Sequence, residues 1–215
     1  FLIVFTAGAF YLAACNNAPS GDSTQTTNEE TAAEISGQTF GVDTTATKLE
    51  WYAAKQTGQH NGLFSITDGV ISVENGQVTG GNFNINAASL TATDLEGEDK
   101  GKLEGHLKSA DFLETDKYPT AKFTMTKVEP ATATTTSAVA GATHLISGNL
   151  QLKDSTKNVT FPAKITVDSS KVNAVADFVI DRTDWGLNYK GPNNPADWMI
   201  KKEVNLKLNL TADKK

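Results

Sequence analysis

The chain has 215 residues, of which 39% are hydrophobic, and its 19 basic and 25 acidic side chains give a formal net charge of −6. This length can support one well-formed hydrophobic core. The charge argues against nucleic-acid binding, because phosphate recognition needs clustered Lys and Arg and the basic residues here are scattered among acids. The single cysteine cannot form a disulfide within the chain, so packing must hold the fold together.

The N-terminal stretch FLIVFTAGAFYLAA carries no charge and directly precedes Cys15. It is too short to cross a bilayer, which takes about 20 residues, but it suits the apolar part of a secretory signal. Residues 12–15, LAAC, resemble the lipobox of bacterial lipoproteins, in which the cysteine is acylated and the chain is cut before it. We therefore expect residues 1–15 to be a truncated lipoprotein signal and Cys15 to carry lipid. The alternative is a buried N-terminal strand whose cysteine acts as a small hydrophobic side chain.

Residues 16–37 are rich in Ser, Thr, Asn, Gly and Glu, and Ile35 is their only large apolar side chain. Such a segment buries too little surface to offset the entropy that it would lose on ordering. The composition predicts a flexible tether, followed by one folded domain over residues 38–215.

Alternation of apolar and polar side chains, the period of a strand with one apolar face, dominates the folded domain. In chain order, the segments that show it are 40–55, 62–67, 69–74, 77–86, 120–128, 144–153, 159–167, 174–180 and 204–210. Turn signals lie between several of them, at Thr67-Asp68-Gly69, Asn75-Gly76 and Asp154-Ser155. This number of strands at this spacing predicts an all-β domain, an antiparallel barrel or sandwich.

Two segments depart from the strand period. Residues 98–114 place Leu103, Leu107 and Phe112 near helical spacing among charges, which predicts a short helix, or two helical turns, packed beside or across the sheet. Residues 131–143, ATATTTSAVAGAT, are low in complexity and follow a proline. This composition predicts a long, mobile hairpin loop.

No pattern supports catalysis or a metal centre. The three histidines, His60, His106 and His144, lie far apart and share no short ligand spacing. The acids of residues 94–99 fit a solvated loop better than a glycosidase pair. We find no nucleophile elbow, phosphate-binding glycine loop or zinc-protease helix. We therefore expect a protein that is not an enzyme and has no metal or cofactor.

Two clusters are candidates for ligand contact. In residues 58–62 His60 is bracketed by glycines, which permit close backbone approach. In residues 180–187 a strand runs into Arg182 and an aromatic ring, and Arg can bind phosphate or carboxylate through two parallel hydrogen bonds. Structural alternatives stay open for both. His60 could satisfy a carbonyl at a tight barrel corner, and Arg182 could form an ion pair with Asp181, Asp184 or Asp111.

Several ordered motifs over about residues 40–212 resemble those of the YceI-like proteins. They are Trp51 with Lys55, Gly58-x-His60-x-Gly62-x-Phe64, Leu107-Lys108-Ser109-Ala110-Asp111-Phe112, Tyr118-Pro119-Thr120-Ala121-x-Phe123, Gly148-x-Leu150-x-Leu152 and Ile180-Asp181-Arg182-Thr183-x-Trp185-Gly186. The chain departs from the family pattern at Leu113, where a second aromatic is frequent, and at Asn86, where an acid is common.

The resemblance implies an eight-stranded, lipocalin-like antiparallel β-barrel with an elongated apolar channel that holds a polyisoprenoid, such as an isoprenoid quinone or a polyprenyl phosphate. The alternating strands agree with it, since a closed barrel of about eight strands has room for one slender ligand. The same apolar residues could instead interlock into a solid core, and from the sequence both a hollow and a filled barrel stay open.

The predicted protein is thus a carrier or buffer of an isoprenoid lipid, tethered through Cys15 in the bacterial cell envelope, on the periplasmic side or the outer surface. A homodimer is compatible with the sequence. The alternatives are a surface interaction domain with a packed core and, ranked last, an enzyme acting on such lipids with His60 as general base. We expect His60 and Arg182 to contact a head group or the channel mouth. The full set of expected ligand-binding residues is Trp51, His60, Phe64, Phe83, Phe123, Phe161, Phe178, Arg182 and Trp185.

Overall fold

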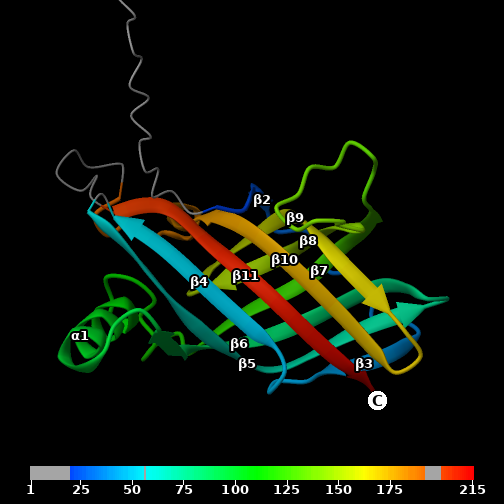
Figure 1. The fold of residues 1–215 in the computed structure, drawn as a ribbon, viewed down its shortest axis with the longest axis horizontal. Helices are drawn as coiled ribbons and strands as arrows, with labels where there is room; N and C mark the ends of the chain where they lie inside the picture. Colours follow the sequence, from blue (N-terminus) through cyan, green and yellow to red (C-terminus); the bar gives the residue numbers. More distant parts are fainter. Residues whose placement is uncertain (1–19, 56, 192–199) are drawn as a thin grey trace, which may run out of the picture.

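A computed structural model describes residues 20–55, 57–191 and 200–215 of the chain. Eight antiparallel strands close into a barrel, and one helix lies beside one end of it (Figure 1). The prediction of an all-β, lipocalin-like barrel of about eight strands with a short helical insertion is confirmed. The predicted signal and Cys15 lie outside the described residues.

Each barrel strand pairs with the next one around the ring, and the last pairs with the first. The strands are β4 (Lys48–Lys55), β5 (Gly58–Glu74), β6 (Gln77–Ala92), β7 (Thr120–Pro130), β8 (His144–Leu152), β9 (Ser155–Val167), β10 (Lys171–Asp181) and β11 (Ile200–Lys214). The ring closes where Leu206 of β11 lies opposite Trp51 of β4. A short strand, β3 (Gln38–Val42), lies between β11 and β5 and so continues the position of β4 along the barrel.

The prediction of a turn at residues 67–69 is wrong, because β5 runs through them as one strand of 17 residues. The register between β5 and β6 shifts between Ile66 and Asp68, which is the mark of a β-bulge. The bulge changes which alternate residues are buried, from Ile66 before it to Ile71 and Val73 after it. Glycine is needed at position 69, since a Cβ there would lie 2.6 Å from the ring of Phe83.

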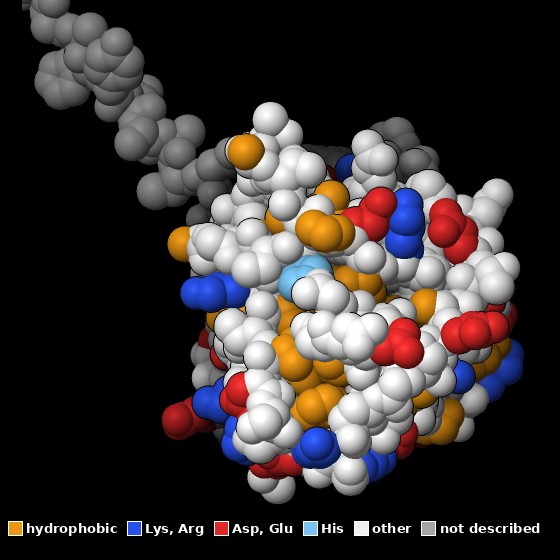
Figure 2. Space-filling model, turned by 90° about the vertical axis from the view of Figure 1, so that its right-hand side faces the viewer, with side chains coloured by type: hydrophobic (Ala, Val, Ile, Leu, Met, Phe, Trp, Pro, Cys, Tyr) orange, Lys and Arg blue, Asp and Glu red, His pale blue; other side chains and the backbone are white. Residues whose placement is uncertain are grey.

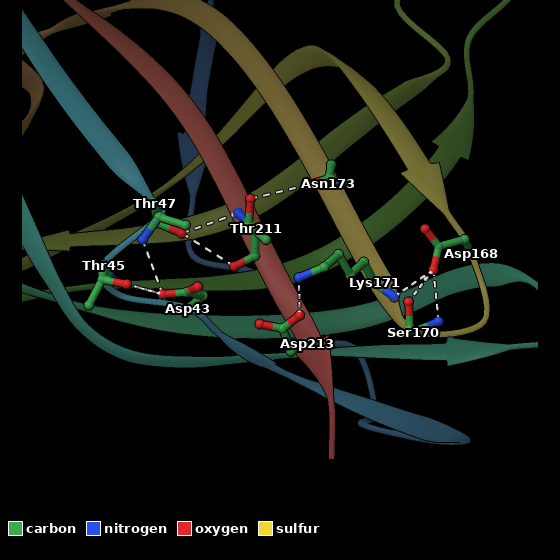
Figure 3. Close-up of polar contacts among 10 residues, drawn as sticks. Asp43, Thr45, Thr47, Asp168, Ser170, Lys171, Asn173, Thr211 and Asp213 are labelled. Atoms are coloured by element: carbon green, nitrogen blue, oxygen red, sulfur yellow. Dashed lines mark hydrogen bonds and ion pairs between the residues drawn. The ribbon is translucent and has the colours of Figure 1, made fainter.

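The segment 40–55 forms two strands instead of one, and an aspartate makes the turn between them. The Asp43 carboxylate accepts hydrogen bonds from the backbone N–H groups of Thr45 and Ala46 and from the Thr45 hydroxyl, at 2.7–3.0 Å. Asp168 makes the same kind of turn between β9 and β10 (Figure 3). An ion pair between Lys171 and Asp213 joins β10 to β11 beside it. These local hydrogen bonds order the end of the barrel that lies opposite the helix.

Residues 20–37 lie along the barrel wall, although the sequence predicts a flexible tether over 16–37. β9 and β10 pair only between residues 163–167 and 172–176. Beyond that point β1 (Asp22–Ser23) pairs with β10 and β2 (Gln25–Asn28) pairs with β9, so the N-terminal segment fills the seam between them. These polar residues bury little apolar surface, but they gain backbone hydrogen bonds to exposed strand edges, which composition alone does not show.

The short helix predicted for the segment 98–114 is confirmed as α1 (Gly97–Lys108), which begins one residue before that segment. Leu103 and Leu107 pack against the barrel. The Glu104 carboxylate accepts hydrogen bonds from the Thr91 hydroxyl and the Ala92 N–H of β6, each 2.8 Å long. These contacts hold α1 at the left-hand end of the barrel in Figure 1.

Two of the predicted connections are confirmed. Asn75 and Gly76 both have positive φ, 52° and 77°, as a two-residue hairpin turn of the primed type requires. Residues 131–143 form the long loop between β7 and β8. This loop is fastened to the N-terminal segment, because the Asp22 carboxylate accepts hydrogen bonds from the Ser137 hydroxyl at 3.0 Å and the Ala138 N–H at 2.9 Å.

Candidate functional site

The barrel interior holds two cavities in line. The outer cavity, of about 320 Å³, lies at the α1 end, and the inner cavity, of about 80 Å³, lies deeper in the barrel. The side chains that line both are Leu49, Ile85, Leu150 and Leu206, so the cavities meet at this aliphatic ring. The barrel is therefore hollow at one end and nearly filled at the other.

The wall of the outer cavity is mostly apolar. Strands β4, β5, β6, β7, β8, β10 and β11 contribute to it, mostly through alternate residues, because successive side chains of a strand point to opposite faces. The helix α1 and the turn after it close one side. The larger apolar side chains of this wall are Leu49, Trp51, Phe64, Ile85, Leu90, Leu103, Leu107, Phe112, Leu113, Leu150, Leu152, Ile180, Leu187, Ile200, Val204 and Leu206. The apolar part of this wall accommodates hydrocarbon.

Among the residues that the structure describes, the polar side chains of the outer cavity are all basic or imidazole: Lys55, His60, His106, Arg182 and Lys201. Each imidazole is held by a hydrogen bond to a carboxylate: His60 Nδ1 lies 2.8 Å from Asp94 Oδ2, and His106 Nε2 lies 3.0 Å from Asp111 Oδ2. The His60 bond therefore goes to a carboxylate and not to the carbonyl considered from sequence. Burial raises the pKa of Asp94, but hydrogen bonds from His60 and from backbone N–H groups outweigh it and lower that pKa overall.

Arg182 opens the short 3-10 helix η1 (Arg182–Trp185) that follows β10, and it is 4% exposed. Its guanidinium donates to four backbone carbonyls. Nε donates to Lys201 O at 3.1 Å, Nη2 to Tyr189 O at 3.0 Å and to Ile200 O at 3.3 Å, and Nη1 to Leu187 O. Because a guanidinium has about five N–H donors, about one is left for a ligand.

The ion pair considered from sequence for Arg182 is not formed within the described residues. Asp181 pairs instead with Lys202, at 2.6 Å, and Asp111 pairs with His106. Arg182 thus ties the segment after η1 to β11 through backbone carbonyls while its charge stays at the wall of the outer cavity.

The two tryptophans of the described chain have opposite surroundings. Trp185, 2% exposed, lies in the core, donates from Nε1 to Leu150 O at 2.8 Å, and lines neither cavity. Trp51, 3% exposed, lines the outer cavity, and its Nε1 has no hydrogen-bond acceptor among the residues described.

Four phenylalanines fill most of the space around the inner cavity. The rings of Phe161 and Phe178 stack with centroids 4.0 Å apart, Phe123 lies 5.8 Å from Phe161, and Phe83 lies 6.2 Å from Phe123. Gly148 makes room for this arrangement, because a Cβ there would lie 2.2 Å from the Phe123 ring. We refer to Phe83, Phe123, Phe161 and Phe178 as the phenylalanine stack.

The end of the barrel beyond the phenylalanine stack lies opposite α1. Figure 2 views this end and shows apolar side chains set between polar and charged ones. Val42, Val128 and Val167, near the ends of β3, β7 and β9, are partly buried against the core there. Of the two cavities, the outer one at the α1 end is the larger, and we take it as the candidate site.

The structure divides the residues predicted from sequence into three groups. Trp51, His60, Phe64 and Arg182 line the outer cavity, and the phenylalanine stack lines the inner one. Trp185 is separate from both. Sequence reasoning missed His106 and Phe112, which also line the outer cavity. The sequence places Phe112 in a helical segment beside the sheet and offers His106 only as a possible metal ligand, so neither pattern indicates a side chain that faces the barrel interior.

Within the described ranges, no three side chains among His, Cys, Asp and Glu lie close enough together to hold a metal ion. The helices of this part of the chain are too short or too polar to cross a bilayer.

Residues 40–212 match the sequence profile of the YceI-like domain. Among solved structures, BcnA of Burkholderia cenocepacia is similar with a TM-score of 0.60 and 17% identity, over 80% of this chain and 99% of that one. A polyisoprenoid binding domain from Saccharophagus degradans, implicated in plant cell wall breakdown, has a TM-score of 0.58 and 17% identity, over 82% and 98%. At such identities the similarity shows the fold. No curated protein matches the sequence.

Proposed function

The chain belongs to the YceI-like family, and on that premise we propose that its barrel binds an isoprenoid lipid, whose apolar chain occupies the outer cavity. The observation that carries the proposal is this cavity of about 320 Å³ with an apolar wall. Ligand pockets in proteins typically have about 300–1,000 Å³. Each buried methylene contributes about 0.8 kcal/mol, so a branched hydrocarbon chain suits the wall. The similarity to a polyisoprenoid binding domain supports the same ligand class.

The polar groups of the outer cavity support a ligand with an oxygen-bearing head. Lys55, His60, His106, Arg182 and Lys201 can all donate hydrogen bonds, whereas no carboxylate of the described residues lines the cavity. An isoprenoid quinone or a polyprenyl phosphate would present acceptor oxygens to them. The protein would then hold such a lipid reversibly, as a carrier or buffer.

The test is native mass spectrometry, followed by organic extraction, on the chain purified from a bacterial host without detergent. We expect a stoichiometric added mass that extracts as an isoprenoid. Phe64→Glu, at the half-buried wall of the outer cavity, should abolish it. Ile35→Glu is the matched control, because Ile35 is 44% exposed and lies outside both cavities. A protein that is empty and resists loading with quinones and polyprenyl phosphates would favour the interaction domain instead.

We further propose that lipidated Cys15 holds the barrel beside a membrane of the bacterial cell envelope, where anchor and ligand would share one surface. The lipobox-like residues 12–15 carry this part of the proposal. One acyl chain gives only marginal membrane binding, so several would be needed for lasting attachment. Expressed behind an established bacterial lipoprotein signal that is joined ahead of residue 12, the wild type should incorporate labelled fatty acid and fractionate with membranes, and Cys15→Ser should do neither. Membrane attachment that survives Cys15→Ser would exclude this anchor.

A further inference from the structure

The two cavities differ in volume, about 320 Å³ against about 80 Å³, although apolar side chains line the barrel interior along both. The phenylalanine stack accounts for the difference, because its four rings line the inner cavity and not the outer one. A hydrocarbon chain that enters at the α1 end therefore meets these rings once it has passed the aliphatic side chains that both cavities share, Leu49, Ile85, Leu150 and Leu206.

The rings of the phenylalanine stack are held in place. A Cβ at Gly148 would lie 2.2 Å from the ring of Phe123, so this ring lies directly on the backbone of β8 and has no room to move outward. The ring of Phe83 lies against the backbone of β5 in the same way. Phe161 and Phe178 stack with an interplanar angle of 4°. A chain could pass the stack only by displacing packed rings, which a close-packed interior resists.

The depth of the outer cavity follows from β4, which lines it from end to end. Leu49 borders the inner cavity, and Lys55, six residues further along β4, lies at the end away from it. At about 3.3 Å for each residue this is about 20 Å along the strand, and about 15 Å along the barrel axis for a strand tilt of about 40°. An extended isoprene unit has four chain bonds of about 1.5 Å and advances about 5 Å. The outer cavity therefore takes about three units.

We propose that the phenylalanine stack is the floor of the ligand site and limits the buried part of the isoprenoid chain to about three units, or about 15 carbons. This rests on the proposed function and specifies its ligand. Longer chains can bind, but the units beyond the third stay outside the barrel and bury no further surface in it. The barrel thus discriminates among short chains and not among long ones, whatever head group the chain carries.

The test is a chain-length series, measured by isothermal titration calorimetry on the full chain. The probes are benzoquinones that carry a prenyl, geranyl, farnesyl or geranylgeranyl chain. In the wild type, affinity should rise by about tenfold or more from the prenyl to the geranyl quinone, because the added unit is buried. From the farnesyl to the geranylgeranyl quinone it should change by less than about twofold, because the fourth unit finds no surface to bury. The corresponding prenyl phosphates should level off at the same length.

A variant of the stack should move the point at which affinity levels off. Phe178→Leu keeps an apolar side chain and removes the ring that lies on Phe161. It should bind the geranylgeranyl quinone about fivefold or more tighter than the farnesyl quinone, because the fourth unit can then be buried. Phe40→Leu is the matched control, since Phe40 is 3% exposed, belongs to the same core cluster and lines neither cavity. It should keep the preference of the wild type.

Two outcomes overturn the proposal. The first is a wild type whose affinity rises as much from the farnesyl to the geranylgeranyl quinone as from the prenyl to the geranyl quinone, which would mean that the chain passes the stack. The second is a folded Phe178→Leu protein with the same preference between the two longest quinones as Phe40→Leu. Failure of the wild type to bind any quinone or phosphate of the series would instead contradict the proposed function itself.

Discussion

Replacing Phe161 with Ala should lower stability and lengthen the chain that the barrel accepts. Phe161 is 5% exposed, stacks on Phe178 with centroids 4.0 Å apart, and lies 5.8 Å from Phe123. Phe→Ala substitutions in cores typically cost about 3–5 kcal/mol. Since Phe161 already borders a cavity of about 80 Å³, it lacks packing partners on that side, so we expect a loss of about 3 kcal/mol, at the lower end of that range.

The space that Phe161 leaves would enlarge the inner cavity, which meets the outer cavity at the aliphatic ring of Leu49, Ile85, Leu150 and Leu206. A longer isoprenoid chain could then pass the phenylalanine stack. At about 0.8 kcal/mol for each buried methylene, even two further carbons contribute about 1.6 kcal/mol, which is more than tenfold in affinity. The variant should therefore gain about tenfold for a geranylgeranyl quinone and little for a geranyl quinone.

Urea unfolding of the empty protein measures the first effect, and calorimetry with the two quinones measures the second. Phe64→Ala serves as control, because it widens the outer cavity without opening the stack. The reasoning fails if Phe161→Ala unfolds within about 1 kcal/mol of the wild type, below the range expected for a packed ring. It also fails if the preference between the two quinones does not change.

Three further predictions concern stability. Arg182→Gln should lower the free energy of unfolding by about 3 kcal/mol or more, because buried carbonyls lose their donors. Urea unfolding measures this loss, with Asp184→Asn, at an exposed position, as the control. Equal stability of the two variants would contradict the prediction. Burial lowers the pKa of His144 in the folded state. The contribution of neutral His144 to the free energy of unfolding should therefore be fully present above the ordinary pKa of 6.5 and be lost as the pH falls through the lowered pKa of the folded state. His144→Gln should remove that part of the decline in urea unfolding from pH 8 to 5, and an unchanged profile would count against it. Burial raises the pKa of Glu104, but hydrogen bonds from β6 outweigh it and lower that pKa overall. Glu104→Gln should therefore reduce the protection of the amides of residues 97–108, measured as the exchange rate relative to the intrinsic rate at the same pH. A fall in pH below 4.5 should reduce the same protection in the wild type, and unaltered protection in the variant would refute this.

The local sequence pattern was enough to predict most of the strands and turns of the fold. The alternation in residues 159–167, 174–180 and 204–210 predicts strands because successive side chains face opposite sides, and these segments lie in β9, β10 and β11. The Asn75-Gly76 turn and the helix within 98–114 are also local features, and both are present. The family resemblance then added the closure into a barrel.

Pattern failed where a residue's role depends on a distant partner. Thr67-Asp68-Gly69 has the composition of a turn, but pairing with β6 on one side makes it a bulge in a continuous strand. Residues 22–28 have the composition of a tether, but they pair in the seam between β9 and β10. In both cases hydrogen bonding to strands far along the chain outweighs the local preference.

The candidate site shows the same division. The local sequence pattern predicted His60 and Arg182 as ligand contacts, and the family resemblance added Trp51 and Phe64; all four line the outer cavity. Sequence treated Trp51 and Trp185 alike, yet Trp185 has an acceptor in Leu150 O and Trp51 has none among the described residues. Whether the barrel is hollow was also open, since the same phenylalanines can fill a space or border it. Tertiary structure decided both, because cavity volume and hydrogen-bond satisfaction are set by distances between side chains from different strands, which no stretch of sequence contains.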